Sequence, residues 1–160
     1  MDYFSPIKEE DLAVIRTDRM SFEQYNCVHS YPVHNVHSFK RVIDELPYER
    51  ILLGVELSKN NYIGEEVDIK FESKETYPLN KSRKYLEMIY HKNEFIKESD
   101  LINNIYLSAE VNDFVFLILN PIKGKKYFDG LSEKVSVDIE GERERILWFE
   151  YDATDIYIVS

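Results

Sequence analysis

The chain has 160 residues, a length typical of one folded domain, so we expect a single domain over residues 1–160. Its 30 acidic and 20 basic residues give a formal net charge of −10 at pH 7. This charge disfavours binding to nucleic acid and to anionic membrane surfaces, because both depend on Lys and Arg side chains.

Capping patterns in the first third of the chain predict helices. Residues 5–15 match a helix that opens with Ser-Pro and carries acids near its start. Residues 21–24, SFEQ, match a capping box and predict a short second helical piece. Ser38 is the expected cap of a helix over residues 39–46, where apolar residues recur at spacings of three and four.

The middle of the chain combines predicted strands with one predicted helix. Residues 50–57, RILLGVEL, indicate a buried strand, and residues 67–72 alternate strictly between apolar and charged side chains, which predicts a half-exposed strand. Residues 82–92, SRKYLEMIYHK, carry apolar side chains on one helical stripe and predict a basic helix. Residues 104–110 and 113–119 follow as two expected strands.

The last third of the chain predicts an antiparallel meander. Residues 134–140 are expected to pair with 145–151 through a turn at Gly141, and residues 156–159 supply the next strand. Residues 146–151 are apolar on both faces, so their strand should be central or covered. The fold class is therefore α+β: a mainly antiparallel sheet with two to four helices, mostly from the N-terminal half, packed on one face.

Several local motifs are absent, and others are ambiguous. The sequence contains no GxGxxG, Walker loop, HExxH or GxSxG, so we expect no cofactor and no enzyme built on these motifs. Glu87 and His91 would lie one turn apart on the predicted basic helix, as an acid–base pair does, but a solvated helix face also explains them.

The stretch NCVHSYPVHNVH holds three of the four histidines and the only cysteine. Cys27, His29, His34 and His37 are of the types that bind zinc. One hypothesis is therefore a small metal-dependent hydrolase that uses the three histidines with Cys27 or a carboxylate. Their spacing matches no established zinc template, and solvent-facing loop histidines explain the stretch more simply.

The densest negative charge lies at the C-terminal end. Residues 129–160 carry nine acids and three bases, a net charge of −6. The acids expected on strands and tight turns there are Asp138, Glu140, Glu142, Glu144, Glu150, Asp152 and Asp155. On one outward-facing patch of a rigid sheet they would create a field that steers a basic partner. An acidic surface without a partner is the alternative.

These observations favour a non-enzymatic binding protein over an enzyme. Its acidic C-terminal sheet would dock and occlude a basic protein, such as a nuclease or toxin, in the manner of an immunity or inhibitor protein. The acidic start MDYFSPIKEED differs from a signal peptide, and one cysteine cannot form an internal disulfide, so we expect a cytoplasmic location. The longest plainly apolar run, FVFLIL, is far too short to span a membrane.

Overall fold

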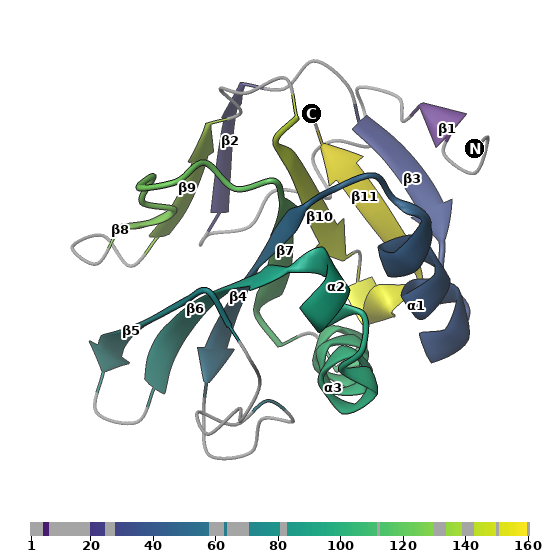
Figure 1. Ribbon diagram of the computed structural model, residues 1–160, viewed down its shortest axis with the longest axis horizontal. Coiled ribbons are helices and arrows are strands. Elements are labelled where there is room, and N and C mark those ends of the chain that lie inside the picture. The colour runs from purple at the N-terminus through teal and green to yellow at the C-terminus, as the bar shows by residue number, and fades with distance from the viewer. Residues whose placement is uncertain are drawn as a thin grey trace.

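A large antiparallel sheet is the centre of the molecule (Figure 1). The computed structural model describes residues 5–6, 20–24, 28–57, 63, 71–80, 83–111, 113–129, 134–138, 143–149 and 151–159. In spatial order, the eight strands of the sheet are β1 (Ser5–Pro6), β3 (Val28–Pro32), β11 (Asp155–Val159), β10 (Arg145–Phe149), β7 (Val115–Leu119), β4 (Arg50–Leu57), β6 (Arg83–His91) and β5 (Ser73–Asn80). Every neighbouring pair in this sheet is antiparallel.

A second, three-stranded sheet consists of β2 (Met20–Gln24), β9 (Lys134–Asp138) and β8 (Phe128–Asp129). Strand β9 pairs in parallel with β2 and antiparallel with β8. A 3₁₀ turn, Tyr151–Ala153, separates β10 from β11. The predicted pairing of β10 with the strand that follows it is confirmed, and so is the central position of β10, which lies between β7 and β11.

Three α-helices of the described chain cover one face of the large sheet: α1 (Val36–Glu45), α2 (Lys92–Phe95) and α3 (Ser99–Glu110) (Figure 1). Their apolar side chains, including Phe39, Phe95 and Ile105, join one buried cluster with alternate residues of the strands. The predicted α+β class and the packing of helices on one face are confirmed. The helices lie in the N-terminal part and the middle of the chain.

Helix α1 confirms the helix expected over residues 39–46 and shows how it begins. The cap is Asn35, whose Oδ1 accepts a hydrogen bond from the Ser38 backbone N–H at 3.0 Å. The Ser38 hydroxyl in turn accepts one from the Asn35 N–H at 3.3 Å, which completes a capping box. The sequence therefore contained the right motif, but Ser38 is its third helical residue rather than its cap.

The opposite face of the large sheet carries a row of aromatic rings. Because side chains alternate along a strand, Ile51, Leu53 and Val55 of β4 face the helices, and the residues between them face away. Ring centroids on the far face follow one another at about 6 Å: Tyr77 to Tyr85 at 6.1 Å, Tyr85 to Phe116 at 6.3 Å, Phe116 to Phe114 at 5.8 Å and Phe114 to Trp148 at 5.9 Å.

Three predictions of secondary structure are wrong. The expected basic helix at 82–92 is strand β6, which pairs with both β4 and β5. The strand expected at 104–110 is the second half of helix α3. Residues 21–24 also form a strand, β2, rather than a helical piece.

The meander is wrong in one strand. Residues 134–138 form β9, which belongs to the small sheet and does not pair with β10 among the described residues. Its parallel partner β2 lies more than a hundred residues earlier, a pairing that no local pattern indicates. The expected helix over 5–15 begins with strand residues 5–6, and its remainder lies outside the described residues, as does most of the strand expected at 67–72.

Candidate functional site

The described part of the histidine-rich stretch divides between several elements. His29 lies on β3, His34 follows the end of that strand, and His37 lies on helix α1. His34 and His37 are both exposed. Among the residues that the structure describes, no three His, Cys, Asp or Glu side chains come close enough together to hold a metal ion. Cys27 lies outside the described residues.

Glu144 does not belong to an outward-facing acidic patch, which corrects one expectation. Its side chain is buried, with 1% of the residue exposed. The Lys125 ammonium lies 3.0 Å from its Oε1, and the Tyr127 hydroxyl donates a hydrogen bond to its other oxygen. The charge of Glu144 is therefore neutralised inside the protein and cannot attract a partner.

The other C-terminal acids do not surround Glu144. Asp152 is exposed and Asp155 is half-buried. Glu144 directly precedes β10, whereas Asp152 and Asp155 follow its other end, about 16 Å away along the strand. Asp138 lies on β9, in the other sheet. Glu140, Glu142 and Glu150 lie outside the described residues.

A compact group of carboxylates and tyrosines lies instead on the far face of the β5–β6 hairpin. We call Glu75, Tyr77, Tyr85 and Glu87 the carboxylate–tyrosine site. In the strand register Glu75 is directly opposite Glu87, and Tyr77 is directly opposite Tyr85. The Tyr77 hydroxyl donates to Glu75, and the Tyr85 hydroxyl donates to Glu87 Oε2 at 2.8 Å.

The two carboxylates are not ion-paired with any described Lys or Arg. Because they face each other across the two strands, their negative charges repel when both are ionised. Glu75 is exposed and Glu87 is half-buried. Burial, together with the charge of Glu75, raises the pKa of Glu87 from 4.5 to about 7, against the opposing effect of the Tyr85 hydrogen bond. Glu87 therefore exchanges its proton near neutral pH.

The strands beneath the site hold it in place. Gly54 of β4 is the register partner of both Glu87 and Phe116, and its missing side chain leaves room for the Phe116 ring and the Tyr85 hydroxyl. Tyr85 is 1% exposed and its ring stacks on that of Phe116 at an interplanar angle of 11°. The tyrosine that bonds Glu87 is thus fixed by packing, as the geometry of a binding site requires.

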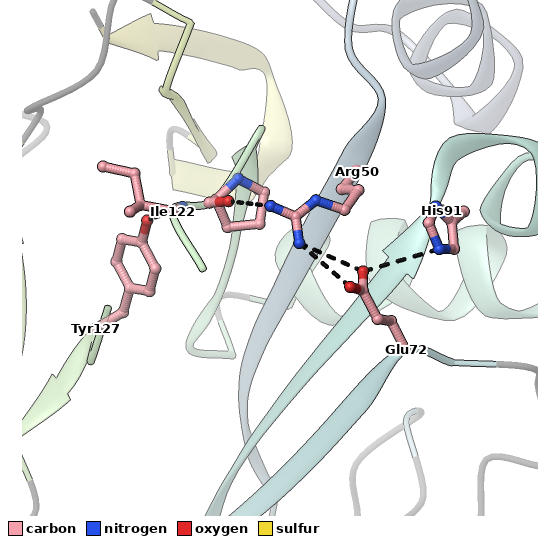
Figure 2. A network of polar contacts seen from close by, with 6 residues as sticks. Arg50, Glu72, His91, Ile122 and Tyr127 are labelled. Atoms are coloured by element: carbon pink, nitrogen blue, oxygen red, sulfur yellow. Dashed lines mark hydrogen bonds and ion pairs between the residues drawn. The ribbon is translucent and has the colours of Figure 1, made fainter. Parts of the chain in front are cut away.

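A second polar network, shown in Figure 2, fixes the neighbouring end of the sheet. Arg50 bonds Glu72 at 3.3 Å and donates to the Pro121 carbonyl at 2.8 Å, and the His91 imidazole lies 3.9 Å from Glu72. The Ile122 N–H donates to the Tyr127 hydroxyl at 3.0 Å. We interpret this network as structural, because its charges are already paired with one another.

The strand geometry of β6 answers the question of a Glu87–His91 pair. On strand β6 these residues are about 13 Å apart along the chain, and His91 approaches Glu72 instead. The acid–base pair suggested by a helical reading is therefore wrong. The pair was expected because residues 82–92 fit a helical period of 3.6 residues, whereas side chains along the observed strand alternate with a period of two.

The sequence does contain a signal for the carboxylate–tyrosine site. Glu75-Thr76-Tyr77 and Tyr85-Leu86-Glu87 are mirror images around residue 81. An antiparallel hairpin centred there brings tyrosine opposite tyrosine and glutamate opposite glutamate, as the register confirms. Reading residues 82–92 as a helix concealed this symmetry.

The chain is similar to an uncharacterized protein, YxiK, from Bacillus subtilis (strain 168). The two are 32% identical over 145 residues, which cover 89% of this chain and 89% of the relative. The chain belongs to the YxiK family. No family model matches the chain, and no solved structure matches it. For this YxiK-family chain, the described helices include none long and apolar enough to cross a membrane.

Proposed function

We propose that the chain is a non-enzymatic binding protein of the cytoplasm that docks and occludes a basic protein, in the manner of an immunity or inhibitor protein. The observation that carries this proposal is the carboxylate–tyrosine site, where two directly opposed carboxylates have no cationic partner among the described residues. A Lys or Arg side chain of the partner would supply the missing charge.

The chemistry of the site suits a cation. Carboxylate oxygens accept hydrogen bonds from ammonium and guanidinium groups, and such charge-assisted bonds are about twice as strong as neutral ones. The half-buried Tyr77 ring beside Glu75 is of the aromatic type that attracts cations, whereas Tyr85 is 1% exposed and serves to hold Glu87. Tyrosine also contributes contact area at low entropic cost, which is why it is common at interfaces.

The charge of the whole chain supports the same role. A net charge of −10 produces a negative field that raises the association rate of a basic partner and repels nucleic acid. We place the contact at the carboxylate–tyrosine site rather than among the C-terminal acids, because Glu144 is buried and ion-paired and lies at the opposite end of β10 from Asp152 and Asp155.

Two double variants, each with two carboxylates replaced by amides, separate these surfaces. One variant combines Glu75→Gln with Glu87→Gln, and the other combines Asp152→Asn with Asp155→Asn. Each variant and the natural chain would be used to capture proteins from the native host at low and at high salt. Mass spectrometry would then identify strongly basic proteins, and one purified partner would be used to measure association rates and affinities.

We expect the natural chain and the Asp152/Asp155 variant to bind the same basic partner, with an affinity that falls as salt is raised. The Glu75/Glu87 variant should bind about tenfold or more weakly, since each lost charged hydrogen bond costs about 1.5–3 kcal/mol. Equal affinity of the Glu75/Glu87 variant would overturn the proposed site. Loss of binding in the Asp152/Asp155 variant alone would mean that the partner contacts the C-terminal acids instead.

A further inference from the structure

We infer that the carboxylate–tyrosine site is a proton-exchanging cation receptor, in which Glu87 holds a proton while the site is empty and loses it when a partner's guanidinium or ammonium group binds. This inference rests on the proposed function and adds a mechanism to it. Docking would then depend on pH as well as on charge complementarity.

The geometry supplies the reason for proton uptake. Directly opposed residues on antiparallel strands have Cβ atoms about 4.5–5.5 Å apart, so two ionised carboxylates at these positions repel strongly. A single bound proton removes one of the two charges, as it does in carboxyl pairs that titrate as a unit. Glu87 is the more buried of the two, and an ionised group is least stable where water is least accessible.

No neighbouring element offers Glu87 a compensating cation within the described chain. Its own strand contributes Tyr85, β5 contributes Glu75 and Tyr77, and β4 contributes Gly54 and, diagonally, Glu56. Further groups on the same side are Phe116 of β7 and Tyr127, whose pKa the charge of Glu87 helps to raise. Lys125 lies over the Tyr127 ring, but its ammonium is paired with Glu144 at 3.0 Å. Lys74 and Lys84 occupy alternate positions of β5 and β6, which face the opposite side of the sheet.

The exchange conserves charge and protons. In the empty site Glu87 is a neutral carboxylic acid, and Glu75 carries the negative charge. When a cationic side chain binds, the Glu87 proton passes to the solvent buffer, and the two carboxylates share the incoming positive charge. No bond other than O–H is broken, and no oxidant or reductant takes part.

Calorimetric titration of the full chain with a polyarginine peptide tests this exchange. The measured enthalpy should change with the ionisation enthalpy of the buffer, with a slope that corresponds to release of up to one proton per binding site. Affinity should rise about tenfold per pH unit below the pKa of Glu87, near 7, and level off above it. Carbon NMR of the free chain should show a Glu87 carboxyl that titrates near neutral pH and at lower pH in Glu75→Gln.

The outcomes distinguish this inference from the proposed function. The Glu87→Gln variant should bind the peptide without releasing a proton. Glu110→Gln, the same chemical substitution at an exposed position of α3, should behave like the natural chain. Binding by the natural chain without buffer dependence, or a Glu87 carboxyl already ionised near pH 5, would overturn the exchange and leave the docking role standing. Failure of the natural chain to bind the peptide would overturn both.

Discussion

At the residue scale, a methyl group at Gly54 would lie 2.2 Å from the Phe116 ring and 2.6 Å from the Tyr85 hydroxyl. These side chains are fully buried and cannot move aside freely. We expect Gly54→Ala to lower the free energy of unfolding by about 3 kcal/mol, at the upper end of the usual cost of overpacking. Urea denaturation would measure the change.

Gly124→Ala is the matched control for this substitution. Gly124 has a φ of +80°, and an added methyl group would meet no atom within 4 Å. Its cost should be the backbone strain alone, about 1–2 kcal/mol. If Gly54→Ala costs no more than Gly124→Ala, the close packing over β4 does not stabilise the fold as we infer.

Glu87 gives a second prediction, on the pH dependence of stability. Its pKa is about 7 in the folded chain and near 4.5 when unfolded, so the folded state binds the proton more tightly. The stability that the folded chain gains by binding this proton is therefore fully present below about pH 4.5 and is lost as the pH rises through about 7. The Gln side chain of Glu87→Gln does not ionise, so the variant lacks this pH-dependent loss of stability.

The unfolding free energy of Glu87→Gln minus that of the natural chain should increase by up to about 2–3 kcal/mol when the pH is raised from about 5 to about 8. Urea denaturation at the two pH values would measure this gain. Glu110→Gln, which is exposed, should show no such pH-dependent gain. A constant difference between natural chain and Glu87→Gln across this pH range would show that Glu87 ionises normally in the folded state.

At the element scale, the capping box of α1 gives a prediction of moderate size. Asn35→Ala removes the side chain that accepts the Ser38 N–H, and the unfolding free energy should fall by about 1 kcal/mol. Asn35→Asp keeps the acceptor and places a negative charge at the positive end of the helix dipole, so it should retain most of the stability. Thermal unfolding of the two variants would compare them, and equal losses would argue against the cap.

The elements that sequence patterns predicted best are those with one clear period. Strand β4 and helix α1 were recognised because the first is a continuous apolar run and the second has apolar residues three and four apart. Strand β6 was not, because Tyr85, Leu86, Met88 and Tyr90 are buried on two faces, and such a run fits both a helix and a strand. These residues form a strand because they pair with β4 on one side and with β5 on the other.

Helix α3 was misread for a different reason. Its buried residues Leu101, Ile102, Ile105, Tyr106 and Ala109 have regular helical spacing. A window that starts at residue 104 omits the first two of these and leaves Ile, Tyr and Leu in succession, a composition typical of strands. The signal for this helix is present in the sequence, but it begins at Leu101, before the segment that resembles a strand.

At the scale of the whole molecule, Lys125 and Tyr127 connect the two sheets. Tyr127 directly precedes β8 of the small sheet, and Glu144 directly precedes β10 of the large one. Lys125→Met would leave the buried Glu144 carboxylate without its cation, and we expect a loss of about 3–5 kcal/mol in unfolding free energy. Denaturation in urea would measure this loss.

Lys126→Met is the control, because it removes the same charge from an exposed neighbour and should change stability little. Adding Glu144→Gln to Lys125→Met should recover part of the loss, because the buried charge is then gone. No recovery in the double variant would mean that Lys125 acts through packing rather than through its charge.

The overall topology could be predicted only where neighbouring strands follow one another along the chain. The predicted pairing of β10 with β11 is of this kind. The hairpin of β5 and β6 is also local, but the helix expected over residues 82–92 excluded it from the prediction. The parallel pairing of β2 with β9 and the ion pair of Glu144 with Lys125 join segments that are distant in sequence. For this reason, the burial of Glu144 could not be inferred from its neighbours Arg143 and Arg145.

Pro78 lies on β5, the last of the described strands at one edge of the large sheet. Proline has no N–H, so a foreign strand aligned along this border would lack a donor at that position. Growth of the sheet from copy to copy, the first step toward fibres, is thereby discouraged at this border. The hairpin can in this way stay accessible to a partner without pairing, strand to strand, with another copy of the chain.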